Sequence, residues 1–211
     1  KADIILWVLL AAISAYSLLL LYSVDRSTGS GYFRTQIFAI ALGVAGAIFL
    51  SLLDYVELSN FWYLLAGFSV FLMIYTALFG DAVKGSGGVD ARAWIVIGGR
   101  TFQSSELVKI AFMLTYAKHL DSLRKRDLIN QPLHVVLLGC HALVPMLLCE
   151  IQGDTGAGMA FFAMFLVMSL AAGVKLRYFA MLGGLVLIAL PILWKFVMED
   201  YQKLRFIALF N

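Results

Sequence analysis

Charged residues are scarce in this chain of 211 residues: Lys, Arg, Asp and Glu make up 14% of it, whereas 62% is hydrophobic. A soluble domain of this length usually carries about 25% charged and 45–50% apolar residues. A soluble fold needs polar side chains to cover its surface, and too few are present here. The composition therefore excludes an ordinary soluble enzyme and a disordered chain, and it predicts an integral membrane protein.

Cysteine and proline are also rare, with two and three residues respectively. Cys140 and Cys149 fall in an apolar stretch without metal-ligand spacing, which excludes a secreted disulfide scaffold and favours buried thiols. His134 and His141 lack carboxylates nearby in the sequence, so we expect structural histidines and no metal site. The net charge is only +3, and no basic stripe is present, so we expect no nucleic-acid partner.

Long uncharged runs are the main positive feature, since about 20 apolar residues suffice to cross a bilayer as a helix. Six runs of about this length carry no charge. A seventh, Glu106–Leu120, is apolar apart from four ionisable residues near its two ends. We therefore predict an all-α, polytopic membrane protein with about seven transmembrane helices. These are expected over Ile4–Val24, Ile37–Leu53, Phe61–Phe79, Glu106–Leu120, Leu133–Cys149, Thr155–Val174 and Tyr178–Trp194.

Basic residues give a weak signal for orientation, because the two sides of such a bundle carry nearly equal numbers of Lys and Arg. The densest cluster, Arg124–Arg126, predicts a cytoplasmic N-terminus. The basic residues on the outer side then need another role. Since the chain begins with Lys1 and ends at Asn211 after an apolar-rich run, we expect a single membrane domain over residues 1–211 that is truncated from a longer protein.

Glu106 and Lys109 are the first candidates for function. They are three residues apart on a predicted helix, so they share a face and can pair. Ionisable groups at membrane depth are costly and usually face the protein interior or an aqueous cavity. The pair either holds two helices together or lines a polar cavity used by a substrate, and the sequence leaves both interpretations open.

The segment Gln152–Gly156 lies between two predicted spans, on the same side of the membrane as Glu106. Asp154 or Thr155 can cap the following helix by accepting hydrogen bonds from its first N–H groups. Alternatively, Asp154 places an acidic group at the mouth of a cavity. Capping alone is the commoner role for such a residue.

A long glycine-rich loop, Gly80–Ser105, contains an amphiphilic segment over Ala91–Gln103. Guanidinium groups bind phosphate through two parallel hydrogen bonds, and an indole lies well at a lipid headgroup interface. Arg92, Trp94 and Arg100 are therefore either interfacial anchors or ligands for an anionic lipid headgroup.

Three segments together resemble motifs of the SEDS family of bacterial membrane proteins (shape, elongation, division and sporulation). Arg92–Ile95 resembles its Arg-x-Trp-Ile element, and Gln103–Lys109 resembles its Gln-Pro-Ser-Glu-x-x-Lys motif at the start of a helix. Gln152–Gly156 resembles its Gln-Pro-Asp-x-Gly motif between two helices. Ser104 and Gly153 stand where the family usually has proline, which indicates a divergent branch.

The resemblance implies a fold of about ten helices, of which this chain has length for about seven. It also implies a peptidoglycan glycosyltransferase that polymerises lipid II at the outer face of the bacterial plasma membrane. The donor is a glycan on undecaprenyl diphosphate, and the expected partner is a class B penicillin-binding protein. The family's catalytic Asp is expected beyond Asn211, so this chain alone should be inactive. The residues expected around the substrate cavity are Glu106, Lys109, Asp154, Arg92, Trp94, Arg100, Gln103 and Gln152.

No cofactor is evident, although the resemblance leaves room for a divalent cation near the lipid diphosphate. Two other functions stay open: a flippase for the lipid-linked precursor, and a non-catalytic scaffold of the cell elongation or division machinery. Polymerisation of lipid II in detergent distinguishes the enzyme from the flippase, because flipping needs two compartments. The sequence does not distinguish the elongation, division and sporulation branches.

Overall fold

The computed structural model describes residues 4–29, 31–52, 57, 60–84, 90–98, 100–196 and 203. The chain divides into two compact units, Lys1–Leu58 and Ser59–Asn211, and each is considered by itself.

The first unit is a pair of packed helices, α1 (Ile4–Thr28) and α2 (Tyr32–Leu52). Neither helix has a buried residue. Between them, the Gln36 Nε2 donates to the Ser17 Oγ over 3.1 Å, and the rings of Tyr22 and Phe33 meet edge to face at 5.5 Å. Two such helices present apolar side chains around most of their circumference, as helices surrounded by lipid do.

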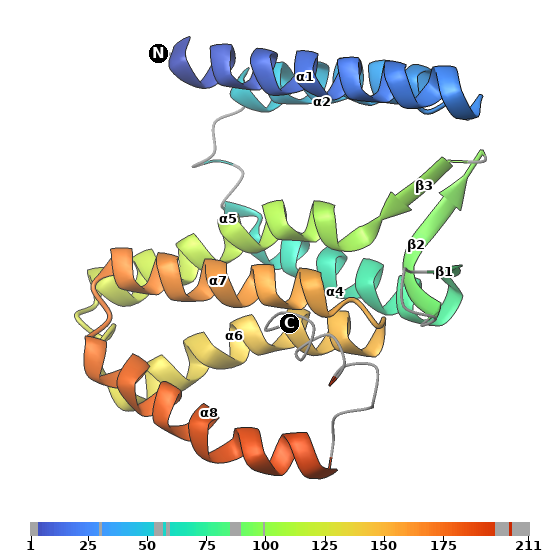
Figure 1. The fold of residues 1–211 in the computed structure, drawn as a ribbon. Coiled ribbons are helices and arrows are strands. Elements are labelled where there is room, and N and C mark those ends of the chain that lie inside the picture. The colour runs from blue at the N-terminus through green and yellow to red at the C-terminus, as the bar shows by residue number, and fades with distance from the viewer. Residues whose placement is uncertain are drawn as a thin grey trace. The chain divides into compact units, whose positions relative to one another are not determined.

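The second unit contains α4 (Trp62–Phe79), α5 (Ser104–Lys125), α6 (Pro132–Ile151), α7 (Thr155–Ala172) and α8 (Leu176–Phe196). Helix α5 packs against α4, α6 and α7, and α6 also packs against α4 and α7 (Figure 1). Helices α5 and α6 therefore form the centre of this bundle. The hydroxyls of the buried Tyr116 on α5 and of Ser169 on α7 form a 2.7 Å hydrogen bond, so these two buried polar groups satisfy one another.

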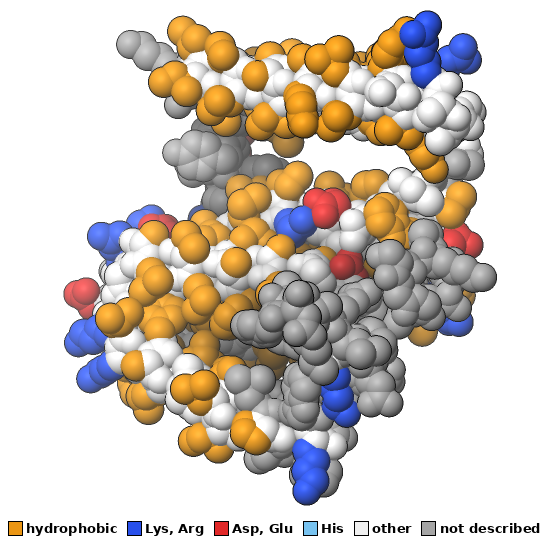
Figure 2. Space-filling model, viewed as in Figure 1, with side chains coloured by type: hydrophobic (Ala, Val, Ile, Leu, Met, Phe, Trp, Pro, Cys, Tyr) orange, Lys and Arg blue, Asp and Glu red, His pale blue; other side chains and the backbone are white. Residues whose placement is uncertain are grey.

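The seven predicted spans are all helices in the structure. Five of them are long and apolar enough to cross a membrane, namely α1, α2, α4, α6 and α7, and α8 adds a shorter apolar portion over Leu176–Ala189. Apolar side chains cover the helices, and most charged side chains lie near helix ends (Figure 2). Together these features define a multi-pass membrane protein. Of the two cysteines expected to be buried, Cys149 is buried but Cys140 is exposed, because it lies on the side of α6 that faces a groove.

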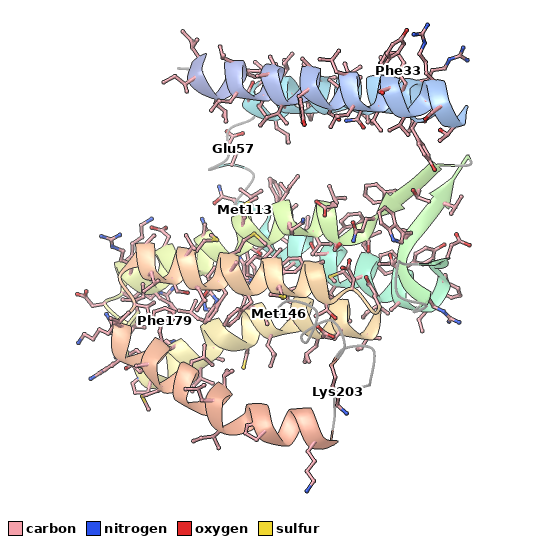
Figure 3. The ribbon with its side chains drawn as sticks, viewed as in Figure 1. Phe33, Glu57, Met113, Met146, Phe179 and Lys203 are labelled. Carbon is pink, nitrogen blue, oxygen red and sulfur yellow. The ribbon has the colours of Figure 1, made fainter. Side chains whose placement is uncertain are left out.

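That groove lies between α6, α7 and α8. It encloses about 600 Å³ and its lining is almost wholly apolar. Met146 on α6 and Phe179 on α8 both line it (Figure 3), and the Phe179 ring lies 6.3 Å from the ring of Phe165 on α7.

One end of the bundle is fastened by Asn130, in the turn between α5 and α6. Its side chain donates to the carbonyl of Gly173 over 3.2 Å and accepts from the N–H of Lys175 over 2.8 Å. Its own carbonyl accepts from the Tyr178 hydroxyl over 2.6 Å. The turns α5–α6 and α7–α8 are therefore joined at the same end as the basic cluster Arg124–Arg126.

The connection between α4 and α5, at the other end of the bundle, is not an irregular loop. It contains a three-stranded antiparallel sheet of β1 (Asp81–Lys84), β2 (Asp90–Ile97) and β3 (Arg100–Gln103), in the order β1-β2-β3. The sheet packs on α4 and α5 through β2, where Ala93 is buried. The amphiphilic segment of the sequence is thus a β-hairpin that leads directly into α5.

Candidate polar site at the start of helix α5

Gln103 and Asp154 join two segments that are far apart in the sequence. Gln103 ends β3 directly before α5, and Asp154 precedes α7. The Gln103 Nε2 donates a short hydrogen bond to the Asp154 Oδ2. The sheet, the start of α5 and the turn between α6 and α7 therefore meet at a single point.

Asp154 is also the N-cap of α7. Its Oδ1 accepts from the backbone N–H of Ala157 over 3.1 Å, which satisfies one of the free N–H groups of the first helical turn. The predicted cap is confirmed. The two carboxylate oxygens have separate partners, since Oδ1 caps the helix and Oδ2 accepts from Gln103. Asp154 is therefore held in one orientation.

Glu106 and Lys109 form the predicted ion pair. The Lys109 Nζ lies 2.7 Å from the Glu106 Oε1. The Lys109 side chain is 24% exposed and the Glu106 side chain is 58% exposed. Both residues lie in the first two turns of α5, which begins directly after Gln103, so the ion pair and the Gln103–Asp154 contact share one end of the bundle. The three cavities that the structure describes have other linings, so a cavity faced by this pair stays a prediction.

Gln152 has a different environment from the one expected of a cavity residue. Its side chain is 1% exposed, and its Nε2 donates to the carbonyl of Met73 on α4 over 2.7 Å. The contact fastens the turn between α6 and α7 to α4. The sequence could not indicate this, because the partner is a backbone atom in a distant helix.

Ser104 and Ser105, the first residues of α5, were not among the candidates. Both are fully buried, and their hydroxyls have no hydrogen-bond partner, like the Oε1 of Gln152. A buried hydroxyl without a partner is costly. The only sequence signal for them was their place inside the motif that begins α5.

The three candidates of the loop lie on the sheet. Arg92 is exposed, and Trp94 is partly buried. Trp94 pairs with Gln103 across β2 and β3, so the indole lies beside the Gln103–Asp154 contact. Arg100 begins β3, and its side chain lies outside the described part of the chain.

The carboxylates of this site already have partners. Among the described residues, no group of three or more His, Cys, Asp and Glu side chains could hold a metal ion. Glu106 is paired with Lys109, and both oxygens of Asp154 accept hydrogen bonds.

The fold and this polar site define a polytopic helical membrane protein with a charged, hydrogen-bonded end and an apolar body. Residues 2–211 match the model of the family described as cell cycle proteins, FtsW/RodA/SpoVE. The chain belongs to this family, which confirms the resemblance to SEDS proteins.

Two similar proteins are both described as peptidoglycan glycosyltransferases. The peptidoglycan glycosyltransferase RodA of Treponema pallidum is 30% identical over 208 residues, which are 95% of this chain and 46% of that protein. The peptidoglycan glycosyltransferase MrdB of Escherichia coli K12 is 27% identical over 207 residues, 96% of this chain and 52% of that protein. The chain thus spans about half the length of the curated relatives that it matches.

Solved structures share the fold. A structure described as showing the coordination of polymerization and crosslinking by a peptidoglycan synthase complex matches with a TM-score of 0.81 and 27% identity, over 97% of this chain and 58% of that one. The rod shape determining protein RodA of Thermus thermophilus matches with a TM-score of 0.72 and 28% identity, over 89% of this chain and 58% of that one.

Proposed function

We propose that the complete protein containing this chain is a peptidoglycan glycosyltransferase that polymerises lipid II at the outer face of the bacterial plasma membrane. The observation that carries the proposal is the contact between Gln103 and Asp154, which joins two segments resembling family motifs into one polar site. The family match over residues 2–211 and the relatives named as peptidoglycan glycosyltransferases support it.

In this reaction a hydroxyl of lipid II attacks the anomeric carbon of the glycan donor. The bond from that carbon to the diphosphate oxygen breaks, and undecaprenyl diphosphate leaves with the electron pair. A carboxylate base takes the proton of the attacking hydroxyl. We place that base in a part of the complete protein beyond Asn211, so this chain supplies binding and orientation.

Arg92 and Arg100 are the residues proposed to contact the diphosphate, because guanidinium groups bind phosphate oxygens in pairs and stabilise the charge of a leaving group. Trp94 would lie at the headgroup level of the outer leaflet. Asp154 would present its charge at the mouth of the substrate path, in the orientation that Gln103 and α7 impose on it.

Glu106 and Lys109 are assigned to holding α5 and shaping the substrate path. Each side chain neutralises the charge of the other. An unpaired charge on a membrane helix is energetically costly, so the pair stabilises α5. The Glu106 Oε1 accepts a hydrogen bond from Lys109. Because this oxygen already has a partner, the contact favours a positioning role for Glu106 over proton transfer.

The proposed orientation has a cytoplasmic N-terminus, with the Arg124–Arg126 cluster in the cytoplasm and the sheet outside. The proposed partner is a class B penicillin-binding protein, which would crosslink the strands. The similar solved structure described as a complex coordinating polymerization and crosslinking supports this partner.

Polymerisation of purified lipid II in detergent tests the proposal. The complete protein, purified with its partner, should produce glycan strands that lysozyme digests. Detergent offers no second compartment, so strand formation separates an enzyme from a flippase. Translocation of lipid II across vesicles without any strand formation in detergent would contradict the proposal, and the absence of both activities would favour a scaffold.

A further inference from the structure

A cleft between α4, α5 and α6 takes no part in the polar site. It consists of two cavities of about 280 and 320 Å³. Both are lined by Trp62, Thr115 and His141, so they adjoin along these three side chains. Together they have the size of a site for a small organic molecule.

The first cavity is lined almost entirely by apolar groups of the three helices. Ala66 and Met73 of α4, Phe112 of α5 and Val144 of α6 are among them. Its two hydroxyl groups are already used within their own helices: Ser69 donates to the carbonyl of Leu65, and Thr115 to that of Phe112. A hydrocarbon chain fits such a lining, whereas a polar ligand would find few partners.

The second cavity has more polar side chains than the first, and Lys118 gives it a positive charge. Besides the shared residues it is lined by Lys118, His119 and Ser122. The Lys118 Nζ donates to the Asn60 Oδ1 over 3.2 Å. Lys118 takes part in neither of the ion pairs that the structure gives for the described residues, which are those of Lys109 and Lys125. The charge of Lys118 therefore meets no carboxylate there, and it favours an anionic ligand.

The polar cavity lies toward the basic end of α5. Lys118 and Ser122 lie within two helical turns of Arg124–Arg126, which predict the cytoplasmic side. Anionic lipids are concentrated in the cytoplasmic leaflet, and basic pockets between membrane helices on that side bind their headgroups. The indole of Trp62, at the start of α4, suits the same depth.

We propose that this cleft binds an anionic phospholipid of the cytoplasmic leaflet. Its phosphate would lie against Lys118 and the ring of His119, which stacks on the ring of His141 at 5.4 Å. Both ring nitrogens of His141 already have partners, namely His119 and Thr115. One acyl chain would run along the apolar cavity beside Phe112. The inference depends on the predicted orientation but not on glycosyl transfer, because the cleft contains none of the residues assigned to the outer site.

Competition between lipids on the complete protein tests this site. Delipidated protein is titrated with phosphatidylglycerol or phosphatidylcholine of identical acyl chains, and bound lipid is counted by native mass spectrometry. Lys118→Gln removes the charge but keeps a donor for Asn60. Lys125→Gln is the matched control, since that lysine lies on the same helix but is paired with Asp121. Lys118→Gln should weaken phosphatidylglycerol binding about fivefold, with Lys125→Gln near wild type.

A second pair of variants tests the acyl chain. Ala66→Phe places a ring in the apolar cavity and should reduce phosphatidylglycerol binding, whereas Leu64→Phe changes a side chain of the same helix outside the cleft and should not. Thermal midpoints of both variants establish that they fold. If Ala66→Phe is unstable, the comparison of Lys118→Gln with Lys125→Gln still decides the question.

Several results would overturn the proposal. Equal retention of phosphatidylcholine would show that the headgroup charge is not recognised. Equal losses in Lys118→Gln and Lys125→Gln would indicate unspecific surface charge. Displacement of the lipid by millimolar inorganic phosphate would indicate a site for a soluble anion. No retained lipid on folded wild-type protein would indicate that another segment of the complete protein fills the cleft.

Discussion

Replacing Asp154 separates its structural role from its charge. In Asp154→Ala, the N–H of Ala157 loses its capping oxygen and the Gln103 amide loses its acceptor. In Asp154→Asn, the amide oxygen still accepts from the Ala157 N–H. The new NH₂ group of this variant can donate to the side-chain Oε1 of Gln103 if the Gln103 amide rotates by about 180° to exchange its oxygen and nitrogen. The two variants therefore differ in hydrogen bonding but equally lack the negative charge.

The expected loss of stability follows from these contacts. Removing an N-cap side chain costs about 1 kcal/mol. Leaving a partly buried amide without its partner adds about 1–2 kcal/mol. Asp154→Ala should therefore destabilise the junction by about 2–3 kcal/mol, and Asp154→Asn by less than about 1 kcal/mol, since Asn is as good an N-cap as Asp.

Hydrogen exchange and thermal unfolding in detergent measure this difference. The N–H of Ala157 should exchange about fivefold or more faster in Asp154→Ala than in the wild type, as the loss of about 1 kcal/mol of capping requires. Glu150→Gln is the control: it removes a charge from the same segment but keeps an oxygen that can accept from the Thr155 Oγ1, and it should leave the exchange of the Ala157 N–H unchanged. The reasoning is refuted if Asp154→Ala is as stable as wild type, or if Asp154→Asn is as unstable as Asp154→Ala.

Two further changes test the packing around the site. Removing either Glu106 or Lys109 costs about 3–5 kcal/mol if hydrocarbon surrounds the pair, but under about 1 kcal/mol if water reaches it. The charge-swapped double variant should recover most of that loss in thermal unfolding; no recovery would contradict simple pairing. Gly80→Ala should destabilise the protein by about 1–3 kcal/mol, because a Cβ there would lie 2.3 Å from the carbonyl oxygen of Thr76. Gly67→Ala is the control with open space around it, and equal midpoints for the two variants would contradict the steric argument.

The helices could be predicted because an uncharged run of bilayer length has no other stable state in lipid. Their ends were less accurate. The span expected over Glu106–Leu120 is a helix over Ser104–Lys125, since hydropathy detects the hydrocarbon depth whereas hydrogen bonding continues the helix into the polar layers.

The sheet was missed although the sequence contains a signal for it. Gly98-Gly99 separates Ile97 from Arg100, and two glycines between short strands are typical of a hairpin turn. Gly98 has a φ of 59°, which glycine adopts without cost.

The ion pair and the cap of the candidate site were predictable because each depends on residues three apart. The Gln103–Asp154 contact was not, because it joins residues 51 apart whose meeting depends on how three helices pack. The burial of Gln152 and of the two serines that begin α5 also depends on how the helices pack, so it could not be predicted from the sequence.

The central claim is that the polar site formed by Gln103 and Asp154 serves polymerisation of lipid II. Strand formation in detergent by the complete protein carrying Asp154→Asn tests it most directly, because that variant is expected to keep its fold. We predict at least about a tenfold loss of polymerisation at a thermal midpoint close to that of the wild type, because the charge that helps to orient the substrate is removed. Wild-type polymerisation by a folded Asp154→Asn protein would contradict the claim and leave Asp154 a helix cap alone.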